Sequence, residues 1–295
     1  MTRYDALMDR ISRGARILID GATGTELEDR GVAASDEAWT GGAALTHPDI
    51  LRGIHEDYLR LGAEIVISNT FGATRHALED AGLGAQFDDL NRLGVEIARD
   101  AREKAGTPQA LVAGGISYWS WTERHPPLEQ LRSDVARQAR VMAEASADLL
   151  MLEMMVDIDR MLVTLEAARS SGLPVWVGLT CEPDQTGRIC LRNGEPLSDA
   201  LIALSGLDVP LISIMHSHVN HIDASLDVTE RHWHGATGVY AHAGGHSGEA
   251  WIEDNMCPPA AYAAACQRWL GRGVQVIGGC CGFGVAHMKA VRDIM

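Results

Sequence analysis

The sequence lacks a long apolar run, and it lacks an excess of basic residues. No stretch of about 18 consecutive apolar residues occurs, although 46% of the 295 residues are hydrophobic. We therefore expect no contact with a membrane. The formal net charge of −15 argues against a nucleic-acid partner, because phosphates need a basic protein surface. An acidic protein is compatible with a cationic small-molecule substrate.

The chain also lacks a secretory leader and a disulfide framework. Residues 1–5 read Met-Thr-Arg-Tyr-Asp, without the basic-then-apolar order of a signal peptide. The six cysteines have no framework spacing, which in a chain of this length indicates a reducing compartment, and we expect a cytoplasmic protein. No Pro/Ser-rich linker divides residues 1–295, so we expect a single domain.

Short β-rich runs alternate with amphipathic segments along the chain. Eight runs are short and apolar enough for a parallel sheet buried on both faces: 17–20, 65–69, 111–115, 149–153, 175–180, 211–215, 236–240 and 274–278. Helices are expected at 49–61, 128–145, 157–170, 198–204, 221–233 and 258–270. Eight strand–helix units in about this length predict an α/β fold, a single (β/α)8 TIM-type barrel. The Gly-rich stretch 235–248 is interpreted as a loop after the seventh strand.

Polar residues follow the predicted strands at the ends where barrels of this type carry their chemistry. In strand order they are Asp20-Gly21, Asn69-Thr70, Ser117-Tyr118-Trp119, Glu153, Thr180-Cys181, His216-Ser217-His218, Tyr240-Ala241-His242 and Cys280-Cys281. We expect these side chains to converge on one mouth of the barrel. Asp20-Gly21 could equally form a plain turn. Glu153 follows an apolar run and needs a partner, for which a cationic ligand group is suitable.

The run Val276-Ile277-Gly278-Gly279-Cys280-Cys281-Gly282 predicts a buried strand that ends in a tight turn. Adjacent cysteines do not readily form a disulfide with each other. Two thiols on one glycine-flanked turn can instead reach a single soft metal ion, with His216 as a third ligand. The alternatives are two small buried thiols and a hydrogen-bonded core histidine.

Seven of the twelve histidines lie close together in the sequence and could form a second metal site. They are His216, His218, His221, His232, His234, His242 and His246. For His221, His232 and His234 we favour a polar loop or an exposed helix face. The His216-Ser217-His218 triplet matches the H-x-H pairing of barrel-fold zinc hydrolases, although those enzymes usually carry it on the first strand.

Over nearly its whole length the chain resembles the homocysteine S-methyltransferase family, zinc-dependent thiol methyltransferases of (β/α)8 fold. The resemblance rests on four segments: 19–27 (Ile-Asp-Gly-Ala-Thr-Gly-Thr-Glu-Leu), 69–74 (Asn-Thr-Phe-Gly-Ala-Thr), 148–153 (Asp-Leu-Leu-Met-Leu-Glu) and 278–282 (Gly-Gly-Cys-Cys-Gly). The last of these is the family's most specific motif. The resemblance implies methyl transfer from a small onium donor to the thiol of homocysteine or a related thiol, giving methionine.

The resemblance also implies roles for individual residues. Cys280 and Cys281 would be two of three Zn²⁺ ligands. The family's third ligand is the cysteine of an Asn-Cys pair, where this chain has Met215-His216, so His216 would complete the set and leave a fourth position for substrate. Asp20 and Glu153 would hold the ammonium group of the acceptor. Further substrate contacts are expected from Gly21, Asn69, Thr70, Tyr118, Trp119 and His242.

The sequence indicates the methyl donor less directly than the acceptor. An onium donor favours an aromatic wall, for which Trp39, Tyr118, Trp119 and Trp121 are candidates. Because the chain ends at Met295, directly after the expected eighth helix, we expect no cobalamin or folate domain. S-methylmethionine or a similar sulfonium is then the preferred donor, and the protein is expected to be a monomer or small homo-oligomer.

Two other functions are compatible with the altered strand ends. One is a zinc hydrolase built around His216, His218 and His242, with Glu153 or Asp20 as the base. The other is a family member that binds a ligand without catalysis. The usual Tyr-Pro-Asn of the family, here Tyr240-Ala241-His242, is a second departure beside His216.

Overall fold

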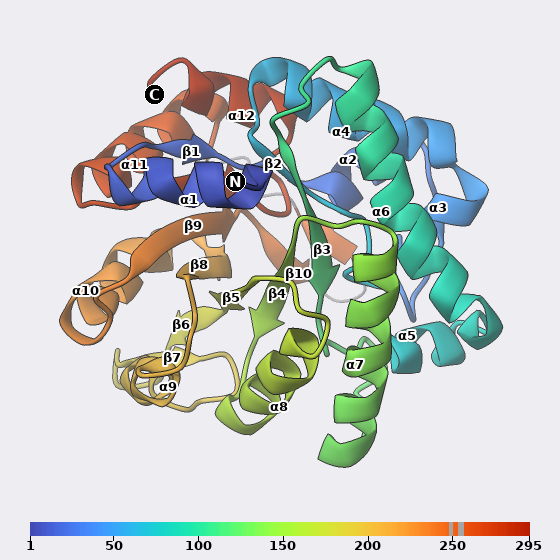
Figure 1. The fold of residues 1–295 in the computed structure, drawn as a ribbon. Helices are drawn as coiled ribbons and strands as arrows, with labels where there is room; N and C mark the ends of the chain where they lie inside the picture. Colours follow the sequence, from blue (N-terminus) through green and yellow to red (C-terminus); the bar gives the residue numbers. More distant parts are fainter. Residues whose placement is uncertain (248–249, 253–256) are drawn as a thin grey trace.

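Figure 1 shows the computed structural model, which describes residues 1–247, 250–252 and 257–295. Eight parallel strands form one sheet in the order β1-β12-β9-β8-β5-β4-β3-β2. A bridge between Ile19 and Ile65 brings the two edges together. The strands are β1 (Ile17–Leu18), β2 (Ile65–Ile67), β3 (Leu111–Ile116), β4 (Leu149–Met155), β5 (Val175–Leu179), β8 (Leu211–His218), β9 (Ala236–His242) and β12 (Val276–Gly279). The predicted (β/α)8 barrel is confirmed.

The helices lie around the outside of the barrel (Figure 1). Six of them match the predicted segments to within one residue at each end: α4 (Pro48–Leu61), α7 (Leu128–Glu144), α8 (Ile158–Arg169), α9 (Leu197–Leu204), α10 (Ile222–His232) and α11 (Pro259–Gly271). The others are α1 (Arg3–Ser12), α2 (Thr23–Asp29), α3 (Ala43–Thr46), α5 (Arg75–Asp80), α6 (Phe87–Lys104) and α12 (Val285–Arg292). Of these, α12 is the expected eighth helix.

Two short hairpins extend from the barrel and were not predicted. One pairs β6 (Cys181–Pro183) with β7 (Ile189–Leu191), and the other pairs β10 (Gly245–Ser247) with β11 (Ala250–Ile252). The interpretation of 235–248 as a loop is wrong for most of its length, because it contains β9 and β10. Pairing with β8 and β12 outweighs the low strand propensity of its glycines. Residue 248 lies outside the described residues.

Alternate residues of the strands face two different apolar layers. One set fills the barrel interior and includes Ile17, Ile65, Leu111 and Trp176. The residues between them face the helices, as the two-residue period of a strand requires. Helix α1 packs Leu7 and Ile11 against the interior cluster, and in Figure 1 it lies across the barrel. Within the described residues, no helix has the length and apolar character that a membrane span requires.

Candidate active site

The carboxyl ends of β4 and β8 are each interrupted by an irregularity. The register of β4 against β5 shifts between Leu152 and Met155, and that of β8 against β9 shifts between Met215 and His218. Inside these irregularities Met154 has a φ of 58° and His216 a φ of 50°. A left-handed conformation costs a non-glycine residue about 1–3 kcal/mol. Irregularities of this kind re-aim side chains at strand ends, and here they place Glu153 and His216 at the barrel mouth.

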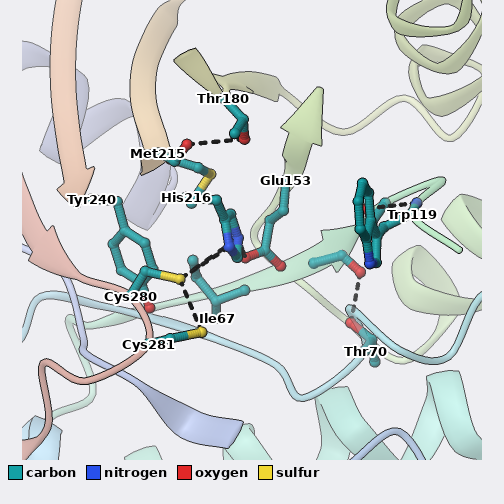
Figure 2. A network of polar contacts seen from close by, with 12 residues as sticks. Ile67, Thr70, Trp119, Glu153, Thr180, Met215, His216, Tyr240, Cys280 and Cys281 are labelled. Atoms are coloured by element: carbon teal, nitrogen blue, oxygen red, sulfur yellow. Dashed lines mark hydrogen bonds and ion pairs between the residues drawn. The ribbon is translucent and has the colours of Figure 1, made fainter. Parts of the chain in front are cut away.

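Cys280 and Cys281 lie in the turn that follows β12. The Cys280 amide donates to the Ala241 carbonyl at 2.7 Å, and the Ala243 amide donates to the Cys281 carbonyl at 3.0 Å. Gly282 has a φ of 80°, which glycine adopts without a steric penalty. The turn therefore holds the two free thiols together, with 3.6 Å between their Sγ atoms (Figure 2).

The His216 ring lies between Cys280 and Glu153 (Figure 2). Its Nδ1 is 3.0 Å from Cys280 Sγ, and its Nε2 is 3.4 Å from Glu153 Oε2. Phe71 stacks on the ring with 5.1 Å between the centroids and 20° between the planes. His216 is 8% exposed, and these contacts hold its ring at a defined place beside the thiols.

The thiols and the imidazole fit a tetrahedral zinc ion in their chemistry and nearly in their spacing. Bond lengths of about 2.3 Å to sulfur and about 2.0 Å to nitrogen place two sulfurs about 3.8 Å apart and a sulfur and nitrogen about 3.5 Å apart. The Cys280–Cys281 distance of 3.6 Å agrees, and the Cys280–His216 distance of 3.0 Å is shorter by about half an ångström. No three His, Cys, Asp or Glu side chains of residues 1–247, 250–252 and 257–295 already form a complete metal-binding group. A small outward shift of the imidazole would therefore accompany metal binding.

Burial raises the pKa of the Cys280 thiol well above its usual value, and the neighbouring Cys281 acts in the same direction. A buried thiolate has few compensating charges here without a cation, because charge is costly in a low-dielectric interior. Ionisation of Cys280 and the binding of a positive ion should therefore occur together.

Glu153 is a nearly buried carboxylate, 5% exposed, at the end of β4. Gly115 of β3 leaves the room for it, because a Cβ at position 115 would overlap Glu153 Oε1. Among the ion pairs of the described residues, Glu153 has His216 as its partner and no lysine or arginine. A buried carboxylate without a strong cation nearby favours a ligand that brings a positive charge.

Asp20 is fully buried directly after β1. Its Oδ2 accepts the Ile67 amide at 2.7 Å, and its Oδ1 accepts the Tyr240 hydroxyl at 3.4 Å. Burial raises the pKa of Asp20 well above its usual value, and the charge of Glu153 acts in the same direction against the Ile67 amide. Asp20 does not line the cavities of the mouth, and its contact with them is the hydrogen bond from the Tyr240 hydroxyl.

Three adjoining cavities meet at His216, which lines all of them. The inner cavity holds about 420 Å³, open mouth included, and Asn69, Glu153, Tyr240, Cys280 and Cys281 are among its lining residues. The aromatic cavity holds about 640 Å³, open mouth included, and it is lined by Trp39, Phe71, Trp119, Trp121, Met154, Arg192, His216, His242 and Cys281. The metal-ligand candidates thus lie where the cavity that Glu153 lines meets the aromatic one.

The outer cavity is the histidine-rich part of the mouth. His218, His221 and His242 line it, with ring centroids 5.5 Å apart for His218–His221 and 5.8 Å apart for His218–His242. Burial lowers the pKa of His242 to about 3, and the nearby His216 and His218 act in the same direction. His242 is therefore neutral at physiological pH. His216 is the histidine that the structure brings to Cys280, while side-chain positions for His246 lie outside the described residues.

Three of the predicted substrate contacts lie behind the cavities rather than on them. The Tyr118 hydroxyl accepts the Val156 amide at 2.9 Å and donates to the Asp157 carbonyl, which fixes the segment after β4. The Thr70 hydroxyl donates to the Gly115 carbonyl at 2.7 Å. The Gly21 carbonyl accepts the Tyr240 hydroxyl at 3.0 Å. The structure gives these residues supporting contacts, whereas Asn69, Trp119 and His242 do line the mouth.

Three residues of the aromatic cavity were not singled out from the sequence as site candidates: Phe71, Met154 and Arg192. Phe71 directly follows Asn69-Thr70 and Met154 directly follows Glu153, so the position after a strand was a usable signal for both. Arg192 follows the unpredicted β6–β7 hairpin, and no pattern in the sequence places it at the mouth.

Comparisons with known proteins agree on one family. Residues 17–295 match the family described as homocysteine S-methyltransferase. The chain is 28% identical to homocysteine S-methyltransferase of Escherichia coli strain K12, over 99% of both chains. It is 26% identical to S-methylmethionine–homocysteine S-methyltransferase BHMT2 of Pongo abelii, over 97% of this chain and 80% of that protein. The crystal structure of the metallated form of the Escherichia coli homocysteine methyltransferase MmuM superimposes with a TM-score of 0.81 at 27% identity, covering both chains fully.

Proposed function

The chain belongs to the homocysteine S-methyltransferase family, and we propose that it moves a methyl group from a small sulfonium donor to the thiol of homocysteine with the help of zinc. The observation that carries the proposal is the cluster of Cys280, Cys281 and His216 at the wall between a carboxylate-bearing cavity and an aromatic one. Such a wall is where an acceptor sulfur and an onium methyl group can meet.

Cys280, Cys281 and His216 are the residues that would hold the metal ion, with the fourth position left for the acceptor. Bound there, zinc supplies the positive charge that keeps a substrate thiol, with a free pKa of about 8.5, in its thiolate form near neutral pH. The existence of a metallated form of the Escherichia coli relative supports a bound metal in this chain.

The acceptor is oriented by the inner cavity. Glu153 provides a buried negative charge for the acceptor's ammonium group, and Asp20 accepts the hydroxyl of Tyr240, which lines the same cavity. Asn69 also lines this cavity, and it is held by a hydrogen bond from its Nδ2 to the Thr40 carbonyl at 2.9 Å and by one from the Thr40 hydroxyl to its Oδ1 at 3.5 Å. A fixed ammonium group determines where the acceptor sulfur lies.

The aromatic cavity suits the donor. In the transfer, a bond forms between the acceptor sulfur and the methyl carbon while the bond from that carbon to the sulfonium sulfur breaks. The donor leaves as a neutral thioether, and no proton is transferred in this step. Trp39, Phe71 and Trp121 line this cavity, and aromatic rings attract a sulfonium charge. The name of the Pongo abelii relative supports S-methylmethionine as the donor.

The test joins metal analysis to methyl transfer. Protein purified under reducing conditions without added metal is expected to carry about one zinc per chain and to form methionine from homocysteine and S-methylmethionine. Cys281→Ser is expected to lose both, whereas Cys257→Ser, at a similarly half-buried cysteine outside the site, is expected to keep both. Protein that neither contains zinc nor takes it up when supplied would contradict the zinc part of the proposal.

A further inference from the structure

Arg192 is a basic side chain built into the aromatic cavity. It directly follows β7, and its amide donates to the Thr180 carbonyl at 3.1 Å, which ties the end of the hairpin to the end of β5. Its guanidinium carbon lies 5.0 Å from the centre of the Trp119 ring. Arg192 lines both the aromatic and the outer cavity. The backbone contact and the ring together hold the charge at the mouth.

Among the residues that the structure describes, the guanidinium of Arg192 has no carboxylate partner. Throughout the part of the chain that the structure describes, no ion pair or side-chain hydrogen bond from Arg192 to an acidic group occurs, and the lining of the aromatic cavity contains no aspartate or glutamate. Glu182 also lines the outer cavity, but among the described residues it does not pair with Arg192. Most charged arginines of this acidic chain do pair, as Arg124 does with Asp80 at 2.7 Å. A positioned arginine with all its donors available is suited to a carboxylate.

We propose that Arg192 binds the carboxylate of the methyl donor and is the residue by which this enzyme distinguishes an onium carboxylate from a simple onium cation. This inference rests on the proposed methyl transfer and specifies its donor class. A donor that carries only a positive charge would be repelled by the positive charge of Arg192 in the aromatic cavity. A donor with a carboxylate at one end and a sulfonium at the other satisfies both the guanidinium and the remaining aromatic faces.

The acceptor is a less suitable partner for Arg192. Its ammonium group is assigned to Glu153 in the inner cavity, and Arg192 does not line that cavity. The two cavities share His216, Cys281, Trp39 and Phe71, which is where the reacting sulfur and methyl group would meet. The acceptor would thus approach this wall from one side and the donor from the other.

The test compares S-methylmethionine with its carboxyl methyl ester, which keeps the sulfonium and loses the negative charge. In the wild-type protein kcat/KM is expected to favour S-methylmethionine by about tenfold or more, and Arg192→Gln is expected to remove most of that preference by raising the donor KM. The matched control is Arg188→Gln, on the same hairpin but outside the three cavities, which should keep the wild-type preference. Retention of that preference in Arg192→Gln would overturn the inference, as would an effect confined to the KM of homocysteine.

A binding measurement separates this inference from the proposed function. Trp39, Trp119 and Trp121 line the cavity, so titration of tryptophan fluorescence with S-methylmethionine or the ester reports occupancy without turnover. Weaker binding of S-methylmethionine to Arg192→Gln, with unchanged binding of the ester, supports the inference. If the wild type binds S-methylmethionine through Arg192 but transfers no methyl group to homocysteine, the proposed function fails and the carboxylate site stands. Equal binding of S-methylmethionine by the wild type and Arg192→Gln sinks the inference.

Discussion

A single buried histidine, His55, makes the stability of the folded protein depend on pH. It lies in α4, is fully buried, and neither ring nitrogen has a hydrogen-bond partner within the described part of the chain. Burial lowers the pKa of His55 from 6.5 to about 4. The unfolded chain therefore binds a proton at His55 between pH 6.5 and pH 4 that the folded protein does not bind. His55 therefore lowers the free energy of unfolding as the pH falls through that range.

Replacing His55 with leucine should remove that pH dependence. The shift of its pKa corresponds to about 3 kcal/mol of unfolding free energy lost by the wild type between pH 7 and pH 4. His55→Leu is expected to lose less over this range and to be more stable at pH 7 by about 1–2 kcal/mol, because two unsatisfied buried polar atoms disappear. Urea unfolding at several pH values measures both effects, with His234→Leu as the control at an exposed histidine. Parallel pH profiles for His55→Leu and the wild type would show that His55 is solvated or partnered.

The residues of the site differ in how well the sequence predicts them. Cys280 and Cys281 could be predicted because a strand followed by glycines fixes their position within the chain. That His216 approaches Cys280 also depends on its left-handed backbone, which hydrophobic patterning does not encode. Arg192 could not be predicted, since its position depends on a hairpin with few apolar residues and on Trp119, far away in the sequence.

At the scale of elements, β3 presents two neighbouring glycines to different surroundings. A Cβ at Gly114 would press on Met142 and Leu150 in the layer that packs against the helices, at 2.6 Å from Met142 Sδ. A Cβ at Gly115 would instead overlap the Glu153 carboxylate in the barrel mouth. An added methyl group therefore disturbs core packing at Gly114 and the position of the Glu153 carboxylate at Gly115.

Gly115→Ala and Gly114→Ala should therefore differ in function more than in stability. Both are expected to lose about 1–3 kcal/mol of unfolding free energy through overpacking. Gly115→Ala should also raise the KM for homocysteine about tenfold, because it displaces Glu153 without removing its charge. Gly114→Ala should leave that KM near the wild-type value. Steady-state kinetics beside urea unfolding checks the pair, and equal KM values for the two variants would mean that Glu153 does not position the acceptor.

The sequence patterns that predict the fold are local, because each one reports on a single helix or strand. Caps and periodicity located α4 and α11 to within one residue, since proline and glycine limit where a helix can begin or end. Helix α6 was missed although it carries a usable pattern, with Asp88 and Asp89 in its first turn and Arg102 and Lys104 in its last. The predicted carboxyl end of β8 is three residues too early. The last residues of this strand are ordered by pairing with β9 across an irregular register, which the sequence pattern does not show.

At the scale of the whole molecule, the proposed metal ligands connect distant parts of the chain. His216 and Cys280 are 64 residues apart in sequence, and β9 lies between their strands in the sheet. Glu153 and Asp20 come from β4 and from the end of β1. The closed barrel brings these groups together, so the complete site exists only in the folded protein.

Zinc should therefore stabilise the folded chain, since an unfolded chain does not hold Cys280, Cys281 and His216 at one point. A ligand that binds only the folded state adds about 4 kcal/mol at a free concentration 1,000 times its Kd. Thermal unfolding of the wild type is expected at a lower temperature after zinc is removed by a chelator, and readdition should restore it. Cys281→Ser should unfold at the same temperature with and without the chelator, while Cys257→Ser should behave as the wild type. If chelation removes zinc from the wild type, as elemental analysis would show, and the unfolding temperature stays unchanged, the metal is not held between β8 and β12 as proposed.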